Sequence, residues 1–169
     1  MRIETERLYI VEFTPDMARD VHANSLDDDT RRFVPDEVFA TVDAARRAVE
    51  FLMAQYGRSD DPQAYPVLAK ADGANVGYVQ LVPLDGGRWE IGYHIARRYT
   101  GRGYATEAVR AFLPKMAEKL GICEVYGVCL CDNLGSRRVL EKCGFEPVFE
   151  GVGDYQGQKR EIFVSVRRL

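Results

Sequence analysis

The sequence has no long apolar run, and no segment approaches the roughly 18 consecutive apolar residues of a membrane-spanning helix. The N-terminal segment MRIETERLYIVEF alternates charged with apolar residues and lacks the apolar stretch of a signal peptide. The net charge is only −3, which gives no broad basic surface for nucleic acid, although a local basic patch stays compatible with it. We therefore expect a cytoplasmic protein that binds neither membranes nor nucleic acids.

Residue patterns typical of metal sites are also missing. The chain has two histidines, and its four cysteines show no C-x₂-C pair of the kind that zinc sites use. Cys129 and Cys131 are separated by one residue in an apolar run, so they would share one face of a strand. We expect buried, reduced thiols and no metal. With 169 residues, the chain can fold as one domain over residues 1–169 without disulfides.

Hydrophobic periodicity and turn signals predict a mixed α+β sheet with the element order β-α-α-β-β-β-α-β-α-β-β. The predicted strands are residues 7–13, 64–70, 75–82, 88–96, 124–131, 145–151 and 160–166. The predicted helices are residues 14–26, 41–57, 104–120 and 134–143. A long helix separates strand 88–96 from strand 124–131, so these two strands are expected to be parallel, after an antiparallel meander.

The connections carry further expectations. Residues 27–36 and the glycine-rich residues 152–159 are predicted to be loops. Pro114 should bend the third helix, because it removes the hydrogen bond to the carbonyl of Arg110. The predicted helix N-caps are Thr14, Thr41 and Asn133.

The stretch RRYTGRGYATEAV, residues 97–109, places two glycines directly before a predicted helix. The first N–H groups of a helix have no partner within it, and its dipole favours negative charge there. Glycines leave these amides accessible, and Arg97, Arg98 and Arg102 add positive charge nearby. The pattern favours a cofactor that carries two or three phosphates, although a tight turn before a helix would use the same glycines.

Two common nucleotide loops do not fit this stretch. A P-loop requires Gly-Lys-Ser/Thr, but Gly103 is followed by Tyr104 and Ala105. The Rossmann fingerprint requires a third glycine near Thr106 and parallel strands on both sides of the helix. A different phosphate ligand is therefore indicated.

The string Arg98-x-x-Gly101-x-Gly103-Tyr-Ala-Thr-Glu-Ala resembles the pyrophosphate loop of the GNAT acetyltransferase superfamily, with its Gln/Arg-x-x-Gly-x-Gly/Ala signature. The longer string EIGYHIARRYTGRGYATEAV is similar to the branch of ribosomal-protein N-terminal acetyltransferases (RimJ/RimL-like). That branch also has an N-x-x-S-x-x-x-x-E-K-x-G-F segment, which the chain matches from Asn133 to Phe145. The resemblance covers essentially the whole chain, including the opening ETERLYI.

This resemblance implies a GNAT-like sheet, mostly antiparallel, whose central parallel strands 88–96 and 124–131 splay apart around acetyl-CoA and are flanked by helices. The backbone at His94, Ile95 and Ala96 would pair with the pantetheine amides, and Asn133 would contact the pantetheine arm. The resemblance places the pyrophosphate on residues around the helix start: Arg98, Gly101, Arg102, Gly103, Tyr104, Ala105 and Thr106.

Acetyl transfer to an amine requires a base for the amine proton and a donor for the departing thiolate. Glu90 is the candidate base, because it shares one strand face with Gly92 and His94; His94 and water are alternatives. Many superfamily members carry a tyrosine seven residues after the asparagine, but Leu140 stands there. Ser136 is therefore the candidate donor, with water as the alternative.

We thus predict an acetyl-CoA-dependent N-acetyltransferase that acts on a primary amine by direct attack in a ternary complex. The acceptor is a protein N-terminus or a small molecule, approached by variable residues 25–38 and 152–159. Aspartates at 27, 28 and 29 would attract a cation or simply form a solvated loop. The alternatives are a non-catalytic acyl-CoA-binding or sensor domain and, less favoured, a nucleotide-phosphate binder. A homodimer is compatible with the sequence.

Overall fold

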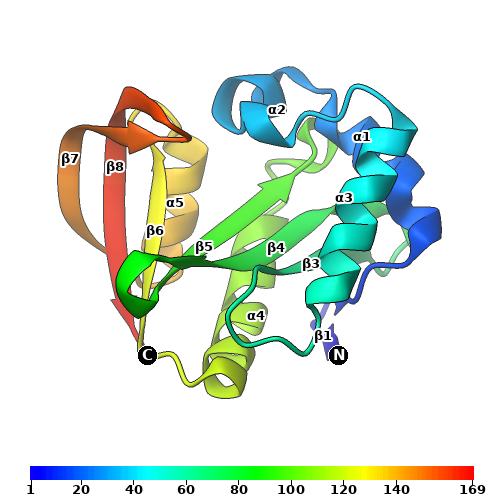
Figure 1. The fold of residues 1–169 in the computed structure, drawn as a ribbon, viewed down its shortest axis with the longest axis horizontal. Helices are drawn as coiled ribbons and strands as arrows, with labels where there is room; N and C mark the ends of the chain where they lie inside the picture. The colour runs from blue at the N-terminus through cyan, green and yellow to red at the C-terminus, as the bar shows by residue number, and fades with distance from the viewer.

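The computed structural model describes residues 1–169 and contains one eight-stranded sheet with the strand order β1-β2-β3-β4-β5-β6-β8-β7 (Figure 1). Neighbouring strands are antiparallel, except β5 and β6, which are parallel as expected. The strands are β1 (Arg2–Glu4), β2 (Leu8–Val11), β3 (Gln63–Ala69), β4 (Asn75–Leu84), β5 (Arg88–Ile95), β6 (Glu124–Leu130), β7 (Glu146–Tyr155) and β8 (Gln158–Arg168). The predicted mixed, mostly antiparallel sheet is confirmed.

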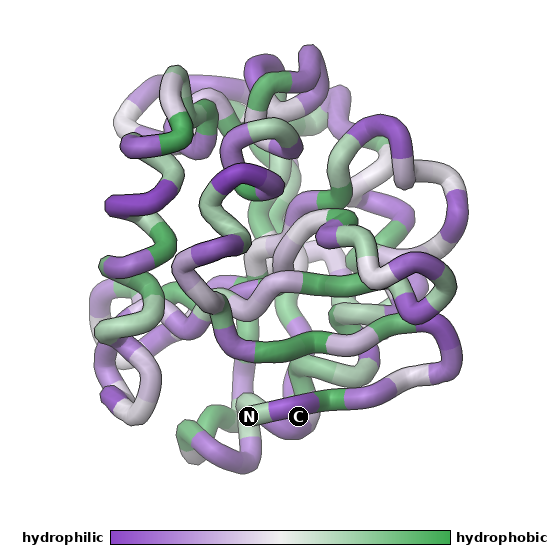
Figure 2. The backbone as a smooth tube through the Cα atoms, turned by 90° about the vertical axis from the view of Figure 1, so that its right-hand side faces the viewer, coloured by the Kyte–Doolittle hydropathy of each residue, from purple (hydrophilic) through white to green (hydrophobic).

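Helices cover both faces of the sheet. The α-helices are α1 (Ala18–Ser25), α2 (Asp28–Phe33), α3 (Val42–Gln55), α4 (Tyr104–Leu120) and α5 (Leu134–Lys142). The main core lies between the sheet and α4 and α5, and a smaller cluster lies under α3 on the opposite face. The tube view shows hydrophobic and hydrophilic residues alternating along the helical turns (Figure 2), as expected for helices that bury one side.

Two of the three predicted N-caps form. The Thr41 hydroxyl accepts a hydrogen bond from the Ala44 amide at 3.1 Å, and the Asn133 side chain accepts one from the Ser136 amide at 3.0 Å. Thr14 makes no side-chain capping bond; it precedes a short 3₁₀ turn, Pro15–Met17, after which α1 begins. Pro114 lies inside α4, as predicted.

The prediction of a loop over residues 27–36 was wrong. Asp27 caps α2 by accepting a hydrogen bond from the Thr30 amide at 2.8 Å, and a 3₁₀ turn, η2 (Pro35–Glu37), follows. The aspartates thus lie at the start of a helix and two arginines at its end, an arrangement that the helix dipole favours. Charge composition alone had suggested a solvated loop.

The second predicted loop, residues 152–159, and the N-terminal end also differ from expectation. Strands β7 and β8 stay paired to Tyr155 and Gln158, so only Gln156 and Gly157 form the turn. Both turn residues have positive φ, 53° and 75°, which matches the twist of a two-residue hairpin. The short strand β1 was not predicted. It pairs with β2 from Arg2 to Glu4.

The burial of the four cysteines differs from the expectation. Cys129 and Cys143 are buried and Cys131 is partly buried, but Cys123 is exposed, so the prediction of uniformly buried thiols was wrong. None of the helices has both the length and the apolar character needed to cross a membrane.

The parallel strands β5 and β6 splay apart. Their pairing consists of Glu90 opposite Tyr126, whereas β4 and β5 pair continuously from Gly77 opposite Ile95 to Leu84 opposite Arg88. Because β5 continues to Ile95 and β6 to Leu130, a wedge opens beyond the contact, as the two diverging strands in Figure 1 show. Glu90 stands at the narrow end of this wedge.

Candidate active site

The loop before α4 presents a row of unpaired amides. The backbone N–H groups from Gly101 to Thr106 donate no hydrogen bond within the protein. Gly101 and Gly103 have φ of 77° and 80°, a backbone conformation that side chains disfavour. A Cβ atom added at Gly101 would meet no atom of the protein within 4 Å. Free donors, open space and a helix start together fit a pyrophosphate group.

An N-terminal clamp holds this loop in place. The Glu107 carboxylate accepts hydrogen bonds from the Thr5 hydroxyl at 2.6 Å, the Arg7 amide at 2.9 Å and Arg7 Nε at 2.7 Å. Arg7 also donates to the backbone carbonyl of Arg102 at 2.9 Å. Burial raises the pKa of Glu107, but the bonds from Thr5 and Arg7 outweigh it and leave the pKa below its usual value.

Sequence reasoning did not assign a role to Thr5, Arg7 or Glu107. They lie in the strings ETERLYI and ATEA, which carried the resemblance but gave no sign of their mutual contact. Glu107 lies about a hundred residues from Thr5 and Arg7, so no sequence pattern around it indicates this contact.

The three arginines of the loop are differently engaged. Arg98 donates to the Asn24 side chain at 2.7 Å and stacks over Tyr99 with 4.8 Å between guanidinium carbon and ring centre. Arg97 lies 3.6 and 3.9 Å from two aspartate carboxylates of α2. Arg102 is exposed and has no acidic partner. Of the three predicted positive charges, only that of Arg97 has carboxylates nearby, and Arg102 has no side-chain hydrogen-bond partner.

Fewer backbone groups of β5 face the wedge than predicted. The Ala96 amide donates to the Val76 carbonyl at 2.9 Å, so the alternating pattern of an antiparallel pair also turns the His94 backbone toward β4. The same pattern turns the N–H and C=O of Ile95 toward β6. Of the three residues predicted to pair with pantetheine, only Ile95 has backbone groups free for it, and Tyr93 joins it two residues earlier.

Glu90 has the environment of a general base. Its side chain is partly buried, and its carboxylate forms no hydrogen bond or ion pair in the protein. Burial raises the pKa of Glu90 to about 7, which places its ionisation where an acid–base catalyst is most effective near neutral pH.

His94, the alternative base, is tied into the α2 segment. Its Nε2 shares a hydrogen bond of 2.8 Å with the Thr30 hydroxyl, and its ring stacks on Tyr78 at 5.8 Å between centres. Burial lowers the pKa of His94, although Asp27 and Asp29 act in the opposite direction. This geometry favours a structural role for His94 and leaves Glu90 as the better candidate.

Ser136 has a partner that the sequence did not reveal. The hydroxyls of Tyr93 and Ser136 lie 2.8 Å apart and share a hydrogen bond between β5 and the first turn of α5. Burial raises the pKa of the Tyr93 phenol, so it stays protonated at neutral pH, although the Ser136 contact acts the other way. Leu140 packs its side chain over Gly127 in the core. The chain thus brings a phenol to Ser136 from β5.

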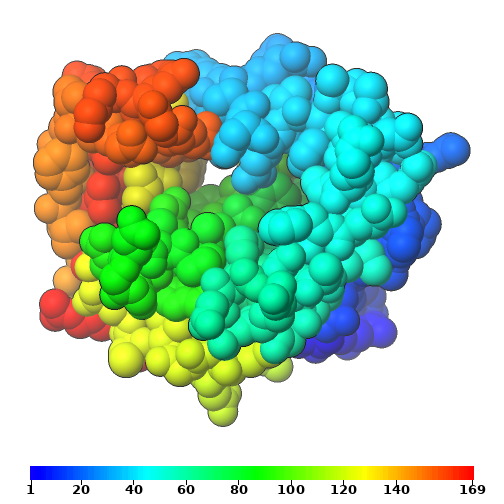
Figure 3. All heavy atoms as spheres, in the orientation of Figure 1, coloured from blue at the N-terminus to red at the C-terminus, as the bar shows by residue number.

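The other side of β5 is roofed by two segments from opposite ends of the chain. The Tyr155 hydroxyl at the hairpin tip donates to the Phe33 carbonyl at 2.6 Å. In the space-filling view a hollow lies between the orange hairpin tip and the light-blue α2 segment, above β5 (Figure 3). Burial raises the pKa of Tyr155, and the charges of Glu90, Asp36 and Glu37 add to this effect. The two predicted variable regions therefore meet above the base.

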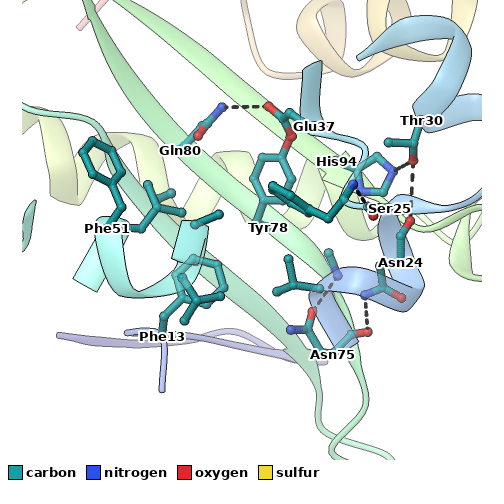
Figure 4. A pocket seen from close by; sticks show the side chains of 17 residues that line it. Phe13, Asn24, Ser25, Thr30, Glu37, Phe51, Asn75, Tyr78, Gln80 and His94 are labelled. Carbon is teal, nitrogen blue, oxygen red and sulfur yellow. Dashed lines mark hydrogen bonds between the residues drawn. The ribbon is translucent and has the colours of Figure 1, made fainter. Parts of the chain in front are cut away.

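An apolar cavity of about 200 Å³ lies beneath α1 and α3, with Thr30 and Glu37 of the α2 and η2 segment in its lining (Figure 4). Phe13, Val49, Leu52 and Tyr78 contribute to its lining. Glu37 and Gln80 lie together at one end, with 3.5 Å between Gln80 Nε2 and Glu37 Oε1. Burial raises the pKa of Glu37 to about 8, and the neighbouring charge of Asp36 adds to it.

Comparison with known proteins agrees with this arrangement. The acetyltransferase (GNAT) domain model matches residues 7–146. The uncharacterized N-acetyltransferase YnaD of Bacillus subtilis is 26% identical over 145 residues, 85% of this chain and 82% of YnaD. A GNAT-family acetyltransferase structure from Bacillus anthracis has a TM-score of 0.85 at 24% identity and covers 99% of this chain and 98% of that chain.

A structure of RimL, a ribosomal-protein α-N-acetyltransferase in complex with coenzyme A, has a TM-score of 0.85 at 16% identity. The match covers 100% of this chain and 98% of RimL. The family match spans most of the sequence, and the free amides before α4 fit the phosphates of the donor. The chain therefore belongs to the GNAT acetyltransferase family, and it is an N-acetyltransferase that takes acetyl-CoA as its donor.

Proposed function

We propose that the protein acetylates a primary amine by direct attack in a ternary complex, with Glu90 as the general base. One observation carries this assignment: the Glu90 carboxylate stands unpaired at the narrow end of the wedge, with its pKa raised by burial to about 7. A base must accept a proton because an alkylamine has a pKa of about 10.4 and an α-amine one of about 8.

The residues proposed to bind acetyl-CoA hold and orient the cofactor. The amides from Gly101 to Thr106 would hold the pyrophosphate, and the free backbone of Ile95 would pair with the pantetheine arm. Asn133 uses its Oδ1 atom as a helix cap, which leaves its Nδ2 group for the same arm. Acetyl-CoA supplies an acetyl thioester, whose C–S bond breaks as the amine nitrogen bonds to the acetyl carbon.

Residues on both faces of β5 take part in the proposed proton transfers. Glu90 takes the proton from the amine, and the Ser136 hydroxyl, itself bonded to Tyr93, donates a hydrogen bond to the leaving sulfur. A thiol has a pKa of only about 8.5, so a hydroxyl donor suffices. Because Tyr93 supplies the phenol that position 140 lacks, the leucine there gives no support to a non-catalytic acyl-CoA sensor.

The similarity to RimL supports placement in the RimJ/RimL-like branch and a protein N-terminus as one acceptor class. A small-molecule amine is the other class, and the apolar cavity beneath α1 and α3 favours it. We also propose that residues 1–169 act as a single N-acetyltransferase domain. The homodimer and the cytoplasmic location stay predictions.

The test is a turnover assay that follows free thiol while acetyl-CoA is offered with small amines and with short peptides that have free N-termini. We expect thiol release that depends on an amine and a matching acetylated product. Tight binding of CoA without turnover on any acceptor would overturn the proposed function.

A further inference from the structure

The cavity beneath α1 and α3 holds a buried donor that has no partner in the protein. Asn75 is 4% exposed, its Oδ1 atom accepts a hydrogen bond from the Gly77 amide at 3.1 Å, and its carbonyl accepts one from Asn24 at 2.9 Å. Its Nδ2 group has no acceptor. The Gly77 contact fixes which side-chain atom is the oxygen, because an amide N–H needs an acceptor.

Buried N–H groups without acceptors are uncommon because they lose their bonds to water. Asn75 lines the cavity, and Figure 4 shows its nitrogen turned toward the side of Phe13, away from Asn24. Because the Nδ2 group has almost no accessible surface, an oxygen atom of a molecule inside the cavity reaches this donor only after a small shift of the side chains around it.

The size and lining of the cavity suit an apolar group. A dry apolar cavity of about 150 Å³ binds benzene in another protein, and this one has a volume of about 200 Å³. Aromatic and aliphatic side chains form most of its wall, among them Phe13, Val21, Phe39 and Leu52. A charged or strongly hydrated chain would lose its water there without compensation.

The end of the cavity opposite Asn75 lies on the side of the proposed base, although Glu90 itself is not part of the lining. Gln80, which lines this end, lies over Gly92, because a Cβ atom added there would come within 2.8 Å of the Gln80 side chain. Glu90 lies two residues further on the same face of β5, about 7 Å along the strand. Glu37 contacts Gln80 from above, so carboxylates lie where the amine end of an acceptor would emerge.

Asn75 and Gln80 are five residues apart on β4, a span of about 16 Å in a strand, so the cavity is elongated along that strand. We infer that the acceptor is a primary amine on an extended apolar arm whose far end carries an oxygen that accepts a hydrogen bond from Asn75. The arm lies in the cavity, and the amine lies between Glu37 and Glu90. This inference rests on the proposed function and names its substrate class.

The experiment compares linear alkylamines of increasing length with amino alcohols that carry a hydroxyl at the far end. The value of kcat/KM should rise about fourfold per added methylene until the cavity is filled. At the best length the amino alcohol should exceed the matched alkylamine. A polyamine and a set of peptides serve as polar acceptors.

Two variants test the site itself. Ala48→Phe places a ring in the cavity and should remove the dependence on chain length, whereas Ala44→Phe, one turn earlier on α3 and outside the lining, should retain it. Asn75→Asp keeps the oxygen that bonds to Gly77 but replaces the donor, so it should abolish the preference for the amino alcohol. Thermal melts show whether each variant is folded.

The outcomes separate this inference from the proposed function. Efficient acetylation of the polyamine or peptides, with no effect of apolar length and none of Ala48→Phe, would overturn the inference and leave the acetyltransferase intact. Absence of turnover on every amine would overturn the proposed function itself. A length-dependent rate that only Ala48→Phe removes would establish the apolar arm.

Discussion

At the scale of single residues, burial decides the chemistry of the two central carboxylates. Neither Glu90 nor Glu37 has a cationic partner, and burial raises their pKa values to about 7 and about 8. In Glu90 this gives the candidate base a suitable pKa at the narrow end of the wedge. At pH values between about 4.5 and these raised pKa values, each carboxyl group keeps a proton in the folded protein that it has already lost in the unfolded chain.

Replacing Glu90 by glutamine should lower kcat by about 10²-fold or more, the usual contribution of a general base, while the affinity for CoA stays unchanged. The wild-type kcat/KM should show an inflection near pH 7 as Glu90 loses its proton. The variant should lack this inflection and rise only as the amine itself loses its proton, so high pH should partly rescue it. A pH–rate profile measures both. Wild-type rates for Glu90→Gln at neutral pH would remove Glu90 as the base.

Replacing Glu37 by glutamine should change how stability depends on pH. Between about 4.5 and about 8 the folded state binds more protons at Glu37 than the unfolded state, so wild-type stability falls as pH rises through this range. Glutamine does not ionise, so the Tm of Glu37→Gln should exceed that of the wild type above pH 8 but not below pH 4. The exposed Glu50→Gln on α3 is the control and should show no such difference.

At the scale of elements, the loop before α4 combines free backbone amides with a fixed position. The amides from Gly101 to Thr106 stay free, while Glu107 in the first turn is held by Thr5 and Arg7. Free donors that are already positioned lose little freedom when they bind an anion. We therefore expect the clamp to contribute to the affinity for acetyl-CoA by holding the loop in place.

A side chain at Gly103 should weaken CoA binding by at least tenfold, because it would enter the space in front of the amides and strain a backbone with φ of 80°. Gly103→Val can be compared with Gly73→Val, which puts the same residue at φ of 72° in a turn between β3 and β4. Calorimetric titration with CoA should separate the two. Equal affinities in folded proteins would refute the loop assignment.

Loss of the N-terminal clamp should weaken the binding of acetyl-CoA and leave the rate of the chemical step unchanged. Glu107→Gln removes charge-assisted bonds to Thr5 and Arg7 that together contribute about 1–3 kcal/mol of stability. We expect a lower Tm and a higher KM for acetyl-CoA, with kcat little changed at saturation. A fall in kcat with unchanged KM would show that Glu107 has a different role.

At the scale of the whole molecule, the acceptor side is assembled from segments that are distant in the sequence. The hairpin tip reaches α2 through the bond from Tyr155 to Phe33, and the two segments border the hollow over β5 (Figure 3). The bond from Tyr155 to Phe33 is the hydrogen bond that joins the two segments, so we expect it to influence how firmly the roof is held.

Removing this bond with Tyr155→Phe should loosen the roof while leaving the donor site intact. We expect faster amide hydrogen exchange in residues 152–159 and a higher KM for the amine, with unchanged affinity for CoA. Exchange rates identical to the wild type would show that packing alone holds the tip.

What the sequence by itself determined is local. The strand and helix order, the caps at Thr41 and Asn133, and the bare glycine loop each depend on residues within a few positions of one another, so their pattern can be read directly. Strand alternation likewise set the face of β5 that carries Glu90, the candidate base. The helix after Asp27 was missed because acidic residues suit both a solvated loop and a helix start.

Only the tertiary structure decided which distant side chains meet. Ser136 and Tyr93 are 43 residues apart, Glu107 and Thr5 are 102 apart, and Tyr155 and Phe33 are 122 apart. Such contacts depend on how helices pack on the sheet, which no local pattern encodes. The raised pKa of Glu90 and the cavity with its unpaired Asn75 donor arise in the same way, because burial is a property of the packed molecule and not of its sequence neighbours.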